Sequence, residues 1–471
     1  MLQALLNVFK IPELRSKILF TLGMLAVYRI GFWIPLPGVD QSALAKLFEQ
    51  AQGEGSALAR AGNFIAMFSG GAFSHSTIFG LGIMPYITAS IIFQLLTTVS
   101  PKLKKLQEEG PTGRQKIMEW TRYATIGLCI IQGFGWLKFI SSGAQGLVMA
   151  EYAASPLWWV MGLSALTAGT VFLMWLGEQI DKHGIGNGVS MIIAAGILAQ
   201  LPGAILWVVN NFDPGDDTKM GWVGLLALLG GFVLIVGGSV LMTVAQRRIP
   251  IQQAKHTRGR KVFGGQRSFL PLRVNHAGVM PVIFASSLMI FPSVIFGMLY
   301  QQASAASATG GSGWGWWLAT TDWLQQNFLM GEFPYIVCEV ALIYFFAYFW
   351  ITVQFNPEEM AKQLREHGSF IPGLRPGPRT AEYLETVMER VTYVGASMLA
   401  VICIVPMVVN RSLGIDFAVA QFLGGTGLLI VVSVVLDFIQ RVEANLLMRN
   451  YAGFLAGEGG KGPRIQSNRS F

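Results

Sequence analysis

Residues 64–96 read FIAMFSGGAFSHSTIFGLGIMPYITASIIFQLL, an apolar run of 33 residues. As one helix this run would be about 50 Å long, whereas the hydrocarbon core of a bilayer is about 30 Å thick. Glycine is a poor helix residue, so Ser69-Gly70-Gly71 is a natural place for a break. The run therefore predicts a short half-helix followed by a full membrane span from about Phe73.

The half-helix has two interpretations. At membrane depth it must be buried in protein or line a water-filled cavity, and it would then be a movable plug in an aqueous funnel. Alternatively, it is an interfacial helix that lies on the external surface. A plug favours a protein with a pore and argues against a membrane-protein insertase without one.

The composition of the whole chain is that of an integral membrane protein. Of its 471 residues, 52% are hydrophobic and 13% are charged, against about 25% charged residues in soluble domains. The charge needed to cover soluble domains of this size is missing. A scan for apolar stretches of about 20 residues predicts ten spans, at residues 18–36, 73–98, 118–140, 155–176, 187–207, 221–245, 277–300, 333–354, 384–409 and 418–440.

The loops between these spans predict their orientation. Alternate loops hold 28 of the 34 Lys and Arg residues on one side and four on the other, and the richer side is cytoplasmic. Both termini are then cytoplasmic, in a multi-pass protein of the cell (inner) membrane. The predicted fold is all-α, with ten transmembrane helices in two inverted five-helix halves. The halves are residues 1–207 and 221–440, with an external hinge loop at 208–220 and a cytoplasmic tail at 441–471.

The residue types that perform catalysis or bind metals do not form a recognisable motif. Cys129, Cys338 and Cys403 lie in apolar runs, which indicates small core residues. The five histidines are scattered without metal-binding spacing, and no nucleotide-binding P-loop occurs. We therefore expect no enzyme, no metal and no cofactor, and any mechanical work must be driven by a partner.

The centre of the predicted spans is almost free of charge, because Glu339 and Asp437 are nearly the only ionisable residues away from the span ends. Instead, aliphatic pairs recur one helical turn apart, as in Ile83/Ile87 and Val189/Ile193. Such pairs are ordinary packing residues in most helices. If they face a pore, they form an apolar constriction that excludes ions by dewetting.

The competing hypothesis is an ion-coupled secondary transporter, with Glu339 as the coupling site. Glu339 lies five residues after Pro334, near the start of its span, so a carboxyl bonded to a neighbouring helix or facing an interface is the alternative. Replacement of Glu339 by Gln separates the two hypotheses, because it would abolish proton coupling and leave protein export intact.

The cytoplasmic loops 246–276 and 355–383 carry more positive charge than orientation requires. The first contains eight Lys and Arg residues and no Asp or Glu, with Arg258-Gly259-Arg260 at its expected tip. The second presents Arg375 in a turn stiffened by Pro372-Gly373 and Pro376-Gly377. Both suit docking to anionic lipid, ribosomal RNA or an acidic protein, whereas the alternative is a topology signal alone.

Several strings, in order along nearly the whole chain, resemble the bacterial SecY family, the central subunit of the Sec protein translocase. They are RIGFWIPLPG (29–38), MFSGG (67–71), LGIMPYI (81–87), MWLGEQI (174–180), GIGNG (184–188), NP (356–357) and PGLRPG (372–377). The resemblance implies a channel that passes unfolded secretory polypeptides and releases apolar segments laterally into lipid. It implies as partners SecE and SecG subunits, the SecA motor ATPase, the ribosome, signal sequences and nascent polypeptides.

The resemblance also implies roles for individual residues. The pore ring would be Ile83, Ile87, Val189, Ile193, Ile283 and Ile430, and the plug would lie at about Gly62–Ala72, including Asn63, Phe64, Ile65, Met67, Phe68, Ser69, Gly70 and Gly71. The lateral gate would open between the second and seventh spans, near Gln94 and Asn275, and ribosome or motor docking would use Arg247, Arg248, Lys255, Arg258, Arg260, Lys261, Arg375 and Arg379. Three features depart from the family: Val189 in place of the commoner Ile, the carboxyl of Glu339, and the extended Ser/Gly/Trp-rich external loop 301–332, to which no role is assigned.

Overall fold

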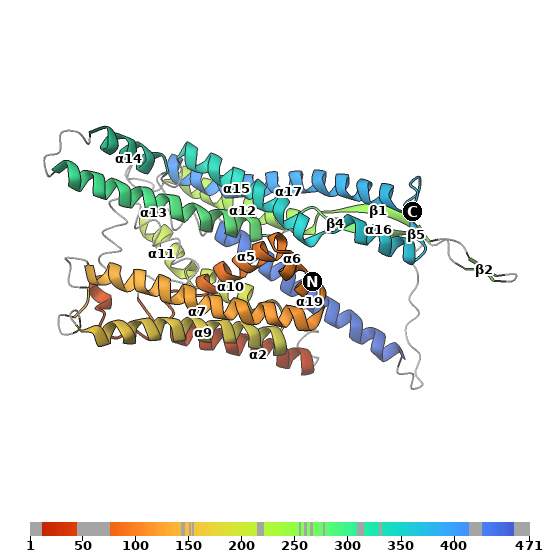
Figure 1. Cartoon of the computed structure of the whole chain (residues 1–471), viewed down its shortest axis with the longest axis horizontal. Helices are drawn as coiled ribbons and strands as arrows, with labels where there is room; N and C mark the ends of the chain where they lie inside the picture. Colours follow the sequence, from red (N-terminus) through yellow and green to blue (C-terminus); the bar gives the residue numbers. More distant parts are fainter. Residues whose placement is uncertain are drawn as a thin grey trace.

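The computed structural model describes residues 12–44, 76–142, 147–149, 152, 155–213, 221–253, 256–258, 261–263, 267–276, 278–308, 315–328, 332–413 and 426–455. These residues form an elongated bundle of helices with a small sheet at one end (Figure 1). The plug residues of the sequence analysis, Asn63 to Gly71, lie outside the described residues, as do Lys255 and Arg260.

Each of the ten expected spans overlaps a helix, and the fifth is made of two. The helices are α2 (Pro12–Gly31), α5 (Met84–Val99), α7 (Pro111–Ser142), α9 (Pro156–His183), α10 (Gly188–Leu198), α11 (Leu201–Asn211), α12 (Trp222–Val244), α13 (Met280–Ala308), α15 (Phe333–Gln354), α17 (Pro378–Leu413) and α19 (Thr426–Leu455). Pro202, near the first turn of α11, separates α10 from α11, because proline lacks the N–H that would continue the helix.

The surface of these helices is suited to lipid. Within the described part of the chain, five segments are long and apolar enough to cross a membrane: Pro156–His183, Gly188–Asn211, Trp222–Val244, Phe333–Glu366 and Pro378–Val405. Large apolar side chains face outward, as in α12, where Val223 is 75% exposed. An apolar surface of this extent requires a hydrocarbon solvent. The chain is a multi-pass helical membrane protein, and its helices are consistent with ten spans.

The second span begins later than expected. The prediction of a helix from Phe73 is wrong for residues 76–83, which form turns, and α5 begins only at Met84. Gly82 has φ of +58°, a conformation that favours glycine, and its N–H donates to the Phe79 carbonyl at 2.7 Å. Pro85 then stands in the first turn of α5, where a missing N–H breaks no helical hydrogen bond.

Much of the expected cytoplasmic loop 246–276 is β-structure, which the sequence analysis did not predict. Strands β1 (Gln246–Gln253) and β4 (Arg267–Arg273) pair antiparallel, and β5 (Ser369–Phe370), from the second cytoplasmic loop, pairs with the far end of β1. A second pair, β2 (His256–Arg258) with β3 (Lys261–Phe263), continues the hairpin. Figure 1 shows these strands extending from one end of the bundle.

Two short helices and an additional external helix complete the fold. Helix α6 (Pro101–Glu108) follows α5, and α16 (Pro357–Glu366) begins at Asn356, whose side chain accepts from the Glu359 N–H. Helix α14 (Gly315–Asn327) lies within the expected external loop 301–332 and packs against α13. That part of the loop is therefore ordered helix.

The helices pack largely with neighbours in the sequence. Helix α9 contacts α2 and α7, α15 contacts α13 and α17, and α10 contacts both α9 and α19. In Figure 1, α2, α7 and α9 lie along one long side of the bundle and α13, α15 and α17 along the other, with α5, α10 and α19 between them. The largest buried apolar cluster has its members in this middle layer and on the inner faces of both sides, including α9, α13, α15 and α17.

Candidate functional site

The six aliphatic residues that the resemblance assigns to a pore ring lie in one apolar cluster, although they come from four helices or their starts. Ile83 and Ile87 stand at the start of α5, and Ile283 belongs to α13. Val189 and Ile193 belong to α10, and Ile430 to α19. Five of the six are buried, with Ile83 and Ile430 each 1% exposed, and Val189 is half-buried against the same cluster.

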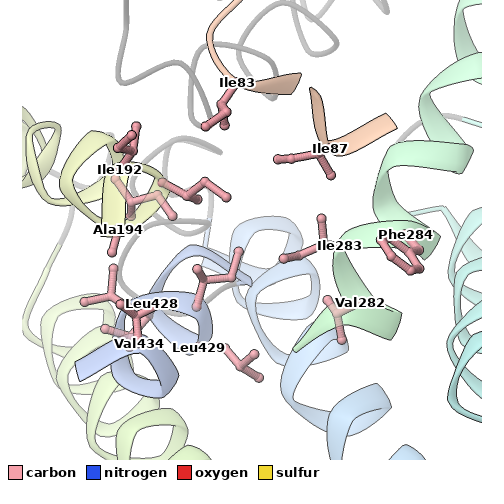
Figure 2. Packing of buried hydrophobic residues seen from close by; sticks show 14 of the residues in the cluster. Ile83, Ile87, Ile192, Ala194, Val282, Ile283, Phe284, Leu428, Leu429 and Val434 are labelled. Carbon is pink, nitrogen blue, oxygen red and sulfur yellow. The ribbon is translucent and has the colours of Figure 1, made fainter. Parts of the chain in front are cut away.

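The cluster also shows how these side chains meet. In Figure 2, Ile83, Ile87 and Ile283 extend toward the side chains of α10 and α19. Ile192 and Leu429 are buried beside them and were missed by the sequence analysis, because residues at neighbouring helical positions are equally apolar. Only their position in the bundle distinguishes them.

The turn before α5 positions the first pair. Gly82 reverses the chain in its left-handed conformation, so Ile83 caps α5 and its carbonyl accepts from the Ile87 N–H at 3.1 Å. That helical bond places Ile83 and Ile87 on one face, one turn apart. The sequence Leu81-Gly82-Ile83-Met84-Pro85 therefore fixes both residues at the start of a helix rather than in its middle.

A polar cap and a close backbone contact position the second pair. The Asn187 side chain accepts from the Ser190 N–H at 3.1 Å, and the Gly188 N–H donates to Asp181 Oδ1 at 2.7 Å. A Cβ atom at Gly188 would collide with the Gly177 carbonyl of α9. The glycine therefore lets α10 approach α9 closely, with Val189 and Ile193 on a helix whose start is fixed.

The chemistry of the cluster is non-directional. The cluster consists of buried apolar and aromatic side chains, and α15, which contributes Ile343, also carries the buried carboxyl of Glu339. Among the residues that the structure describes, no group of three His, Cys, Asp or Glu side chains is placed to hold a metal ion. An aliphatic constriction makes dispersion contacts with any chain and offers no ligand to a hydrated ion.

The two gate residues have separate local environments. Gln94, in α5, is half-buried, and its carbonyl accepts from Thr97 Oγ1 at 2.7 Å. Asn275 is half-buried just before α13. Their joint role at a gate stays a prediction.

The basic residues predicted to dock partners lie on the hairpin and on the turn beside it. Arg247 and Arg248 are exposed on β1, and Arg258 pairs with Lys261 across the β2–β3 hairpin. Arg375 and Arg379 are exposed, and the Arg375 carbonyl accepts from Thr380 Oγ1 at 2.9 Å. The turn holding Arg375 is therefore ordered, with Gly373 and Gly377 both at positive φ.

An ion pair that the sequence analysis missed joins α7 to α9. Arg122 Nε donates to Glu178 Oε1 at 2.8 Å, and its Nη2 donates to Oε2 at 2.7 Å. The bidentate geometry fixes both side chains. The two residues are 56 positions apart, so no sequence spacing could have revealed the pair.

Glu339 has a partner on the neighbouring helix. It is 3% exposed in α15, and Ser286 Oγ of α13 donates to its Oε1 at 3.0 Å. This is the bonded carboxyl that the sequence analysis weighed against an ion-coupling site.

Membrane-spanning helices around a buried apolar cluster, with a basic β-hairpin at one end, define a multi-pass helical membrane protein. The family model of SecY matches residues 77–439. The chain is 42% identical over 462 residues to the protein translocase subunit SecY of Streptomyces griseus, covering 97% of this chain and all of that protein. It is also 42% identical to the protein translocase subunit SecY of Escherichia coli K12, covering 94% of each chain.

Solved structures with this fold are also known. A SecY protein studied for the role of its plug domain in the closed channel aligns with a TM-score of 0.60 at 18% identity, over 94% of this chain and 95% of that one. A structure described as a protein conducting channel aligns with a TM-score of 0.58 at 17% identity, over 96% and 99% of the two chains. The chain belongs to the SecY family, as the sequence resemblance predicted. It is a protein translocase subunit, a protein-conducting channel and not an enzyme.

Proposed function

We propose that Ile83, Ile87, Val189, Ile193, Ile283 and Ile430 form the constriction through which this channel passes unfolded secretory polypeptides. Their burial in one cluster of apolar side chains supports the proposal. An unfolded chain presents every type of side chain in turn, so a ligand-specific site would stop it. Aliphatic side chains make no directional bonds, close around each passing residue, and exclude ions when the channel is empty.

Apolar segments of the transported chain leave sideways. A signal sequence is an apolar helix, which is stable in lipid and unstable in an aqueous pore. The proposed exit lies between α5 and α13, near Gln94 and Asn275, where the first and second five-helix halves face each other. The plug at residues 62–72 would close the external side of the constriction.

A second subunit fits the junction between the halves. A cavity of about 440 Å³ lies between α11, α12 and α19 and is lined only by apolar side chains, among them Val209, Leu225 and Val431. It adjoins the expected hinge at residues 208–220 and would accept apolar side chains from a helix of a partner. SecE is the partner we propose there, with SecG and anionic lipid as further components.

The partner that drives transport docks on the cytoplasmic side. The charge count of the loops supports cytoplasmic termini in the cell (inner) membrane. The exposed Arg247, Arg248, Arg375 and Arg379 support docking of an anionic or acidic surface, which we propose to be the ribosome or the SecA motor. One structural relative, Sec61, was solved in a ribosome–channel complex, with a TM-score of 0.56.

The single observation that carries the proposal is the convergence of aliphatic side chains from both five-helix halves on one buried point. The test is reconstitution of the full chain with SecE and SecG in vesicles, followed by addition of SecA, ATP and a secretory precursor. We expect the precursor to become resistant to external protease only when ATP and an intact signal sequence are both present. Protease resistance that does not require ATP, or that also occurs in vesicles lacking this chain, would contradict the proposal.

A further inference from the structure

The most buried carboxyl that the constriction does not use is that of Glu339. It lies six residues into α15, about 9 Å along the helix axis from Phe333, where the chain is surrounded by apolar neighbours. Charged residues inside membrane spans are rare and costly, and those that persist usually bond to a specific partner. Glu339 has such a partner, because Ser286 Oγ donates to Glu339 Oε1 at 3.0 Å. Ser286 is itself only 2% exposed.

This hydrogen bond joins α13 to α15 close to the apolar cluster. Ser286 lies in α13 one turn beyond Ile283, the ring residue among those that α13 contributes to the apolar cluster. A restraint on Ser286 is therefore a restraint on Ile283, because residues three apart lie on adjoining parts of one helical face. Glu339 is not one of the six ring residues, and its hydrogen bond to Ser286 links it to the helix that carries Ile283.

Other contacts between α13 and α15 do not replace the bond. Phe284 meets Phe346 and Trp350 of α15 edge to face, with ring centroids 5.6 Å and 5.5 Å apart. These aromatic contacts lie seven or more residues after Glu339 along α15, and they are apolar contacts rather than hydrogen bonds. Tyr335, one turn before Glu339, is buried, and its hydroxyl has no hydrogen-bond partner among the described residues. Among these α13–α15 contacts, Ser286 to Glu339 is thus the directional one.

We propose that Glu339 is a positioning residue of the gate, which holds α13 in register with α15 through Ser286 and thereby keeps Ile283 in the closed constriction. The inference rests on the proposed function, because it takes the apolar cluster as the constriction. A lateral exit between α5 and α13 requires α13 to move. The bond sets how readily α13 moves, because α15 must move with it or the bond must break.

The test compares variants of the full chain with SecE and SecG in planar bilayers and in transport vesicles. Glu339→Leu and Ser286→Ala each remove the bond, and we expect each to raise the resting ion conductance about threefold to fifteenfold, the range that corresponds to interhelical hydrogen bonds in membranes. Both variants should also transport precursors whose signal sequence has been shortened. The double variant should be no leakier than the leakier single variant, because the two residues form one link.

Two controls separate positioning from a loss of structure. Glu339→Gln keeps an oxygen that accepts from Ser286, so it should retain wild-type conductance and signal requirement. Ser287→Ala removes a hydroxyl that bonds only its own helix, donating to the Ile283 carbonyl at 2.6 Å, and should also resemble wild type. Conductance of Glu339→Gln equal to that of Glu339→Leu, additive effects in the double variant, or wild-type behaviour of both single variants would overturn the inference.

The failure of the proposed function is distinguishable from these results. Transport of a precursor with a full signal sequence should proceed in every variant. If the wild-type complex does not transport that precursor, the channel proposal fails. If it does and the Glu339 variants change nothing, only the positioning role fails.

Discussion

The apolar centre and the cytoplasmic hairpin of this molecule use opposite chemistry. The central cluster is buried, aliphatic and without directional contacts, whereas the hairpin residues Arg247 and Arg248 are exposed and charged. Under the proposed function, the binding of partners and the passage of the transported chain therefore take place in different regions. Partners would be recognised where charge gives long range and orientation, and the transported chain would pass where the lack of directional bonds lets every side chain through.

A polar side chain in the central cluster should have the largest effect, because it gives the apolar centre the polar character of the hairpin. Ile430→Asn or Ile87→Asn introduces an amide that solvates ions in the proposed constriction, and we expect the conductance of the resting channel to rise about five- to thirtyfold, as a barrier reduction of about 1–2 kcal/mol would cause. Single-channel recording in planar bilayers measures this. Ile131→Asn is the matched control, because Ile131 lies on α7 with 69% of its surface exposed to the outside of the bundle. Equal leakage of Ile131→Asn would show that any polar substitution disturbs the seal.

Reversal of charge at the cytoplasmic end should affect docking and leave conductance alone. With Arg258 and Arg260 both changed to Glu, or Arg375 changed to Glu, we expect SecA or ribosome binding to weaken about five- to tenfold at low salt, with a smaller dependence on salt than wild type. Sedimentation with vesicles containing the complex measures binding. Arg114→Glu, an exposed residue at the start of α7, is the control. Unchanged binding of the hairpin variants would leave their positive charge as a topology signal only.

The ion pair of Arg122 with Glu178 is charged like the hairpin, but it joins two helices to each other. Its loss should therefore lower stability, and by less than the substitutions above change conductance and docking. Both side chains are partly exposed, so solvent screens the pair and its loss should cost about 0.5–1 kcal/mol. Arg122→Ala should lower the unfolding temperature in mild detergent by a few degrees without changing SecA binding. The exchanged pair, Arg122→Glu with Glu178→Arg, should recover part of the loss, and a loss equal to the sum of the single variants would argue against a direct interaction.

His276 marks the boundary between the two regions, where the smallest effect is expected. It stands between β4 and α13, and burial, followed by the positive charge of Arg273, lowers the pKa of its imidazole. In the unfolded chain this imidazole has its ordinary pKa of about 6.5. It therefore takes up a proton at a higher pH than the imidazole of the folded chain does. Stability is therefore complete above that pH and declines as the pH falls below it. His276→Gln should flatten the dependence of the unfolding temperature between pH 7.5 and 5.5, and an unchanged slope would exclude His276 as the cause.

The sequence predicted the spans well and the local turns poorly, for a physical reason. Hydropathy measures whether a segment is stable in hydrocarbon, which is why each predicted span overlaps a helix. It is insensitive to backbone conformation, so the run containing Gly80, Gly82 and Pro85 was predicted as helix from Phe73, although α5 begins at Met84. A positive φ at Gly82 cannot be deduced from hydropathy or composition.

The cytoplasmic sheet was missed because charge dominated the interpretation of loop 246–276. The alternation signal was present, since Ile249 and Ile251 of β1 are buried and their neighbours Arg248 and Pro250 are exposed. Contacts between residues that are far apart in the sequence cannot be predicted from residue spacing. Glu339 and Ser286 are 53 residues apart, and only the packing of α13 on α15 brings them together. The six ring residues were named by resemblance, and their shared burial is what the structure adds.

The strand pairing between the two cytoplasmic loops has a mechanical consequence. Gln252 and Gln253 of β1 pair with Phe370 and Ser369, and at the base of the hairpin the Val274 N–H donates to the Ala245 carbonyl at 2.9 Å. The hairpin therefore joins the ends of α12 and α13, and Ile249 and Leu272 share a buried apolar cluster with Leu384 of α17. A partner that displaced either loop would have to move both loops and these helix ends together, or break the pairing.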